Sequence, residues 1–158
     1  MSDAARAPAS GPGEAPDPVG DLPAYVVLYD GVCGLCHRGV RALMDLDRER
    51  QLHFAPLQGT TAERLGIDWD PEAPSGDATF VFVDNTGAVP VHHERMDGVV
   101  AELDVIGRLP FVASVLRRMP RFLADGLYRV IAASRYRVFG RMDECRLPTR
   151  SQRERFLP

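Results

Sequence analysis

Two cysteines separated by two residues, directly after an apolar run, constrain this chain more than any other feature. The run at residues 24–29 (Ala-Tyr-Val-Val-Leu-Tyr) is rich in β-branched and aromatic side chains, which predicts a short buried strand. Apolar positions at helical spacing begin at Cys36 and predict a helix that ends near Arg50. Cys33 and Cys36 are therefore expected where a strand passes into the N-terminus of a helix.

A helix N-terminus favours thiol chemistry. Its unpaired N–H groups and the positive end of its dipole stabilise a thiolate, and the thiolate is the nucleophile in disulfide exchange. Cys33, at the exposed end, is predicted to attack a substrate disulfide. Cys36, about one turn later, is predicted to resolve the mixed disulfide. This exchange needs no organic cofactor.

Three other interpretations of the pair stay open. The two side chains can act only as small apolar groups in a core. They can bind a metal, and a zinc site would combine Cys33, Cys36, Cys145 and a histidine; without a second Cys-x-x-Cys, no metal is expected. With His37, the pair also matches the attachment signature of c-type haem, although no export signal is visible.

The segments that follow predict an α/β fold. A second strand at residues 52–57 completes a strand–helix–strand unit of the size of a parallel βαβ unit. A short helix is expected at 60–66, and strands at 78–83 and 88–92 are expected to form a hairpin. A parallel pair followed by a hairpin, with helices around it, is the element order of a thioredoxin-like mixed sheet.

From about residue 95 the apolar period is helical, which predicts a C-terminal helical extension. Pro110 and Pro120 divide it, and each is expected in the first turn of a helix. These helices are expected to pack their apolar faces against the sheet. The alternative is a basic amphipathic surface helix with arginines on both sides of its apolar stripe. The last apolar face consists of Leu123, Leu127, Val130, Ile131, Ser134 and Val138.

The charges are distributed unevenly along the chain. All 19 basic residues are arginine; residues 1–107 carry a net charge of −11, and residues 108–158 carry +8. An acidic sheet docked against basic helices explains this split, and a basic face that meets an anionic partner or a membrane surface is the alternative. No basic motif interleaved with aromatic residues points to nucleic acid.

Composition divides the chain into a domain with two tails. Residues 1–23 are rich in Ala, Pro and Gly and contain no apolar signal region, so a disordered tail and a cytoplasmic location are expected. Residues 24–148 are expected to form the thioredoxin-like domain, and residues 149–158 a C-terminal tail. Structural disulfides are rare in the cytoplasm, which favours a redox-active pair.

The residues around the pair resemble a known family. Residues 29–36 (Tyr-Asp-Gly-Val-Cys-Gly-Leu-Cys) are similar to the opening of the DCC family of thiol-disulfide oxidoreductases, named for the pattern formed here by Asp30, Cys33 and Cys36. The resemblance continues at residues 54–58 and returns at 136–141 and 143–148. It implies a thioredoxin-like fold and a dithiol active site.

Five further residues are candidates for supporting roles. Asp30 is expected to bond backbone N–H groups of its turn; alternatively it relays a proton or anchors the loop, and a carboxylate beside Cys33 would raise the thiol pKa. Gly34 and Leu35, between the cysteines, help to set the relative stability of dithiol and disulfide. His37 is expected to be an exposed first-turn residue with a modest effect on the thiols. Cys145 is either a third exchanging thiol or a partly buried apolar residue.

One departure weakens the analogy with thioredoxin. Thioredoxin-like proteins usually place a cis-proline before the third strand, but residues 77–79 contain none and Pro74 comes several residues early. A non-catalytic redox-sensing or metal-binding module using the same cysteines is therefore the alternative function. The preferred prediction is a cytoplasmic thiol-disulfide oxidoreductase acting on a disulfide-containing protein or a low-molecular-weight thiol.

Overall fold

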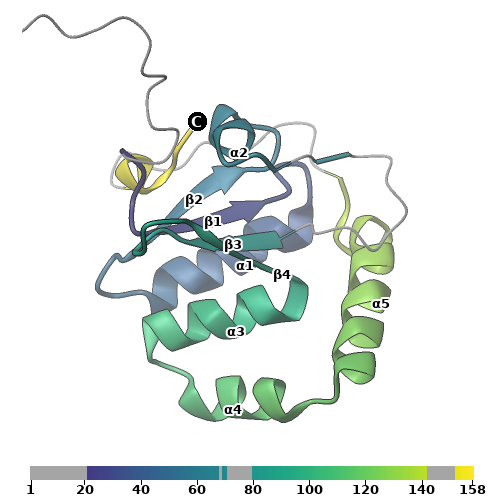
Figure 1. Ribbon diagram of the computed structural model, residues 1–158. Coiled ribbons are helices and arrows are strands. Elements are labelled where there is room, and N and C mark those ends of the chain that lie inside the picture. The colour runs from purple at the N-terminus through teal and green to yellow at the C-terminus, as the bar shows by residue number, and fades with distance from the viewer. Residues whose placement is uncertain (1–20, 68, 71–79, 142–151) are drawn as a thin grey trace, which may run out of the picture.

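Four strands form one mixed sheet in the order β2-β1-β3-β4 (Figure 1). The computed structural model describes residues 21–67, 69–70, 80–141 and 152–158. The strands are β1 (Tyr25–Tyr29), β2 (Leu52–Pro56), β3 (Phe80–Asp84) and β4 (Val91–Glu94). β1 pairs parallel to β2 and antiparallel to β3, and β4 pairs antiparallel to β3. The predicted α/β fold, a parallel βαβ unit plus a hairpin in a thioredoxin-like arrangement, is confirmed.

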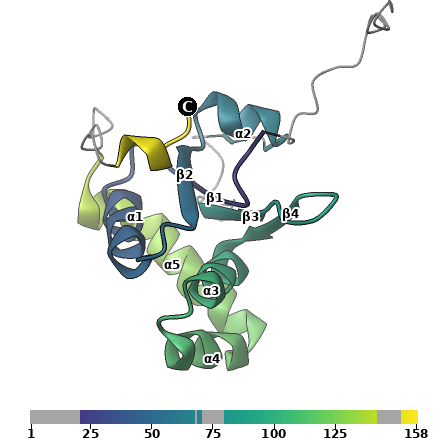
Figure 2. The same cartoon turned by 90° about the vertical axis from the view of Figure 1, so that its left-hand side faces the viewer.

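Both faces of the sheet are covered, because its strands alternate between two apolar clusters. Val26, Leu28 and Val81 face the short helix α2 (Thr60–Arg64). On the opposite face, Val27 and Phe82 belong to the cluster that packs against α1 (Gly34–Leu46) and α3 (Arg95–Ile106). Figures 1 and 2 show α2 on one side of the sheet and α1 and α3 on the other.

Helix α1 ends earlier than the predicted boundary near Arg50. Its C-cap is Asp47, whose carboxylate accepts hydrogen bonds from the backbone N–H groups of Gln51 (3.1 Å) and Leu52 (2.9 Å). Arg50 adopts a left-handed φ of 56°. An aspartate that takes the next backbone donors itself competes with continuation of the helix, and here it leads the chain directly into β2.

The helices α4 (Pro110–Arg118) and α5 (Arg121–Phe139) extend beyond the sheet (Figure 1). Pro110 occupies the first turn of α4 as predicted, whereas Pro120 is the N-cap of α5. No helix in the described part of the chain combines the length and hydrophobicity that crossing a membrane requires.

The prediction that the last apolar face packs on the sheet is wrong. The described structure leaves Leu127 43% exposed and Val130 67% exposed, and it instead buries Ala124 and Ala132. The main contacts of helix α5 are with α1 and α3, and small side chains are buried there in place of the large apolar ones. Together with the exposed Phe111 and other apolar side chains of α4, this face gives the two helices an uncovered apolar surface.

Residues 152–158, within the segment set apart above as a C-terminal tail, pack against β2. Phe156 forms a bridge to Phe54, and the backbone N–H of Leu157 donates to the Phe54 carbonyl (2.8 Å). Arg155, in the short 3-10 helix η1 (Arg153–Arg155), is buried, forms an ion pair with Asp47 and donates to the Leu52 carbonyl (3.0 Å). This segment therefore covers the edge strand.

Candidate active site

Cys33 and Cys36 lie at the junction between β1 and α1, as predicted. Cys33 is the N-cap of α1, with an extended backbone (φ −91°), and its sulfur accepts a hydrogen bond from the backbone N–H of Cys36 (3.4 Å). The backbone N–H of Cys33 donates to the Asp30 carbonyl (3.2 Å), which closes the turn between strand and helix. Both cysteines are free thiols.

The two cysteines differ in exposure, but in the opposite sense to the prediction. Cys33 has no exposed surface, whereas Cys36 is half-buried and lines a cavity. The end of α5 explains this difference: Arg141 forms a bridge with Cys33, and the backbone N–H of Gly34 donates to the Gly140 carbonyl (3.4 Å). The chain therefore brings residues more than 100 positions away over the first cysteine.

The electrostatics of the pair separate the two thiols. A hydrogen bond from the Cys36 thiol is the main cause that lowers the pKa of Cys33 to about 7, assisted by the backbone N–H groups of Cys36 and Leu35. Burial opposes this shift, and the Asp30 carboxylate also raises the pKa of Cys33 slightly. The same hydrogen bond, together with burial, raises the pKa of Cys36. This arrangement favours the thiolate form at Cys33 and the protonated thiol at Cys36.

Asp30 is a fully buried anchor that connects its own turn to two distant segments. Its Oδ1 accepts from the backbone N–H of Val32 (3.1 Å) and from the Gln58 side-chain amide (2.9 Å), and its Oδ2 accepts from the Tyr136 hydroxyl. The Arg135 guanidinium lies 3.7 Å from Oδ2. The expected turn contact is therefore present, and the anchoring role is present beside it.

Gln58, Arg135 and Tyr136 also contact Asp30, although no local sequence pattern marks them as site residues. The side-chain oxygen of Gln58 also accepts from the backbone N–H of Gly31 (3.0 Å), so Gln58 holds the turn as well as Asp30. Arg135 stacks over the Tyr136 ring, with its Cζ 4.4 Å from the ring centroid. Gln58 and Tyr136 fall in segments that carry the family resemblance, which is the signal that could have identified them.

Two other candidates, His37 and Leu35, also lie near the pair. His37 is half-buried rather than exposed: its Nε2 lies 2.8 Å from the Gly31 carbonyl, and its ring meets the edge of Tyr29. Leu35 lines the cavity beside Cys36. Cys145, Pro74 and residues 77–79 lie outside the described residues, and the described part contains no cluster of three or more metal-binding side chains.

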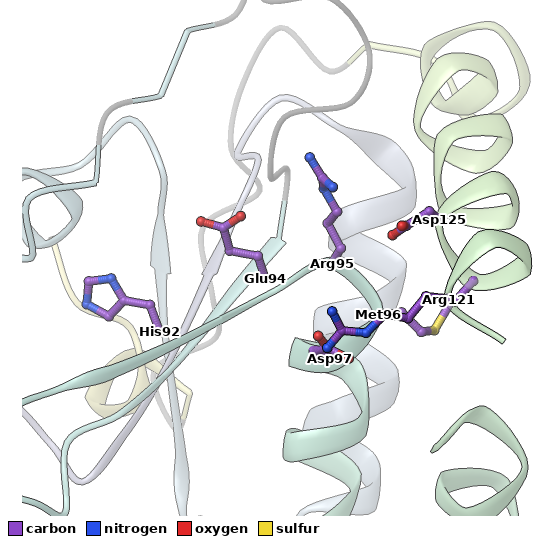
Figure 3. Close-up of a pocket in the computed structure, with 8 residues that line it drawn as sticks. His92, Glu94, Arg95, Met96, Asp97, Arg121 and Asp125 are labelled. Carbon is purple, nitrogen blue, oxygen red and sulfur yellow. The ribbon is translucent and has the colours of Figure 1, made fainter. Parts of the chain in front are cut away.

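A second, polar cavity of about 370 Å³ lies away from the cysteines. Its lining comes from β4, the start of α3 and helix α5, as Figure 3 shows for Glu94, Asp97 and Arg121. His92 also lies on this side. Neither cysteine lines this cavity, whereas Cys36 lines the apolar cavity described above.

Replacing Gly34 by alanine is expected to expose Cys33. A Cβ at Gly34 would lie 2.4 Å from the Phe139 carbonyl oxygen, so the end of α5 must move away. Overpacking of this kind costs about 1–3 kcal/mol, which predicts alkylation of Cys33 by iodoacetamide about tenfold faster or more. Gly39→Ala, also in α1 but with no atom within 4 Å of the added Cβ, is the matched control. Equal alkylation rates in the two variants would contradict the covering role of α5.

A dithiol at the first turn of a helix, on a four-stranded mixed sheet, defines the class of thioredoxin-like dithiol proteins. The chain belongs to the DCC1-like thiol-disulfide oxidoreductase family, whose model matches residues 27–141. The resemblance seen in the sequence is therefore confirmed.

Two curated relatives are similar over most of this chain. A chloroplastic DCC family protein of Arabidopsis thaliana is 34% identical over 122 residues, which cover 77% of this chain and 69% of the relative. The uncharacterized protein YuxK of Bacillus subtilis strain 168 is 34% identical over 141 residues, which cover 87% of this chain and 96% of the relative. No solved structure gives a significant match.

Proposed function

We propose that this protein exchanges its Cys33–Cys36 dithiol with the disulfide of a protein or a low-molecular-weight thiol. The hydrogen-bonded pair carries the proposal, because it lowers the pKa of Cys33 to about 7 and raises that of Cys36. An attacking thiol reacts best when its pKa lies near the ambient pH. Cys33 is therefore suited to attack near neutral pH, with Cys36 held protonated.

The exchange proceeds in two balanced steps. The Cys33 thiolate attacks one sulfur of the substrate disulfide, which forms a mixed disulfide and releases the other substrate sulfur as a thiolate. Cys36 gives its proton to a departing sulfur and then attacks Cys33, which forms the Cys33–Cys36 disulfide and releases the second substrate sulfur. A reducing thiol pool, such as that of the cytoplasm, restores the dithiol.

Access to Cys33 requires the end of α5 to open. The described contacts that hold it over the thiol include the 3.4 Å hydrogen bond from Gly34 to Gly140 and the bridge from Cys33 to Arg141. The Asp30 contacts of Tyr136 and Arg135 lie one turn further back and can keep α5 anchored while its last residues move. The proposal therefore includes a local opening at residues 140–141.

A titration across glutathione redox buffers tests the function. We expect a reversible disulfide between Cys33 and Cys36, located by mass spectrometry, with a potential in the range of known dithiol oxidoreductases, about −120 to −270 mV. Cys145→Ser serves as the control and should leave the titration unchanged. Cysteines that stay reduced or masked by metal throughout the series would overturn the exchange mechanism.

The reactivity of Cys33 should also depend on pH. Because only the thiolate reacts and its fraction grows as pH rises, the alkylation rate of Cys33 is expected to increase with a midpoint near the pKa of about 7 and then to level off. Cys36→Ser weakens the hydrogen bond that stabilises the thiolate and should move this midpoint upward. A midpoint near 9 in the wild-type protein would contradict the assignment of Cys33 as the thiolate.

A further inference from the structure

An apolar cavity of about 330 Å³ opens beside the dithiol. It lies between α1, α3 and α5, with Phe80 of β3 at its wall; Figure 2 shows these three helices grouped on one side of the sheet. Leu35 and Cys36 form part of the lining, so a molecule in the cavity lies next to the thiol that hydrogen-bonds to Cys33. Pockets of this size and character hold small molecules.

Two buried polar side chains in the cavity wall each have one atom without a hydrogen-bond partner among the described residues. Glu102 is 1% exposed, and its Oε1 has no partner among the described residues. Arg135 is 8% exposed; its terminal nitrogens contact Ala132, Tyr136 and Asp30, but its Nε has no partner in the described structure. An unpaired buried polar group destabilises the fold. A bound group that forms hydrogen bonds with these atoms would therefore stabilise the protein.

The chemistry of the two side chains specifies that group. Arg135 can only donate. Burial raises the pKa of the Glu102 carboxyl well above its usual range, which favours its protonated form with an O–H donor. Two donors at the wall of an otherwise apolar cavity select a ligand with an apolar body and an acceptor oxygen, such as a carbonyl.

We propose that this cavity binds the apolar chain of a small thiol or disulfide substrate, with a carbonyl oxygen of that substrate at Glu102 and Arg135. This inference rests on the proposed dithiol function and narrows its substrate class. Cys36 at the cavity wall then lies next to the sulfur atoms of the bound molecule, and Cys33 is its hydrogen-bonded partner.

For a small dithiol that reduces the protein, the reaction is balanced. One ligand thiolate attacks Cys36, which lines the cavity, and breaks the Cys33–Cys36 bond, and Cys33 leaves as the thiolate. The second ligand thiol loses its proton to solvent and attacks the first ligand sulfur, which forms the ligand disulfide and releases Cys36 as a thiolate that takes up a proton. Two electrons pass from the ligand to the protein.

The test compares two dithiols that reduce the oxidised protein. Dihydrolipoamide carries an apolar methylene chain that ends in an amide carbonyl, whereas dithiothreitol is a dithiol without either group. Gly39→Leu places a side chain in the cavity at a position where a Cβ meets no atom within 4 Å. We expect it to slow reduction by dihydrolipoamide about tenfold or more and to leave reduction by dithiothreitol unchanged.

Two further comparisons control for folding and for chemistry. Gly126→Leu makes the same change in α5 at an open position outside the cavity and should alter neither rate. Glu102→Leu removes the donor and should slow dihydrolipoamide about three- to tenfold, whereas Glu102→Gln keeps an N–H donor and should retain most of the rate.

Three results would overturn the proposal. The proposal is overturned if Gly39→Leu leaves reduction by dihydrolipoamide unchanged, if it slows reduction by both dithiols equally, or if it acts no more strongly than Gly126→Leu. Equal rates for Gly39→Leu and the wild-type protein with both dithiols would leave the dithiol function standing and reject the cavity. Failure of Cys33 and Cys36 to form a disulfide, or of that disulfide to react with either dithiol, would reject both.

Discussion

Replacing Cys36 by serine is expected to stop turnover and to trap a mixed disulfide between Cys33 and the substrate. The variant keeps the attacking sulfur at the N-cap of α1 but has no thiol to displace the bound substrate. Mass spectrometry after incubation with glutathione disulfide should show one glutathione attached to Cys33. Steady-state exchange activity should fall to the uncatalysed background.

Cys33→Ser is the complementary variant and should lose both turnover and the adduct. In the wild-type protein the hydrogen bond with Cys33 and burial both raise the pKa of Cys36. The variant keeps the burial, which disfavours the Cys36 thiolate and makes it a poor nucleophile. Cys145→Ser should behave like the wild-type protein in both measurements. Normal turnover by either active-site variant, or an adduct on Cys36 in Cys33→Ser, would contradict the assigned order of attack.

Arg155→Leu is expected to lower the free energy of unfolding strongly. Its guanidinium pairs with Asp47, whose side chain is 1% exposed, and its Nε donates to the Leu52 carbonyl. Removing one partner of a buried ion pair typically costs about 3–5 kcal/mol, because the other charge stays buried without compensation. Urea unfolding should show this decrease in the free energy of unfolding.

Arg153→Leu is the matched control for this prediction. Arg153 lies two residues away in the same 3-10 helix η1 but is exposed, so the change should stay within about 0.5 kcal/mol. A loss of less than about 1 kcal/mol in Arg155→Leu would show that residues 152–158 contribute little to the fold.

The strand–helix junction was predictable because local patterns determine it. An apolar β-branched run, a break at residues 30–32 and helical spacing from Cys36 require no distant partner, and the structure has β1, Cys33 at the N-cap and α1 in that order. The hairpin and the parallel βαβ unit follow from the same periodicities. The end of α1 was less predictable, because it depends on the side chain of Asp47.

The environment of the thiols was not predictable from local patterns. Cys33 was expected to be exposed, but Arg141 and the end of α5 cover it. The sequence predicts that Asp30 accepts a hydrogen bond within its own turn, and the structure shows this bond. Gln58 and Tyr136 also donate hydrogen bonds to Asp30. These contacts join segments 28 and 106 residues apart, and periodicity contains no information about such pairings.

In α5, too, the sequence predicts the helix but not which of its faces is buried. Its spacing correctly predicted a helix, because the period of 3.6 residues is a local property. Which side of that helix is buried depends on the elements it packs against. Helix α5 contacts α1 and α3 and buries Ala124 and Ala132, and Arg135 is buried beside Asp30. Sequence order and composition thus suffice for the elements, the redox motif and the family. Burial of Cys33, the Asp30 anchor and the cavity beside Cys36 arise only when distant segments meet, because each depends on side chains supplied by another element.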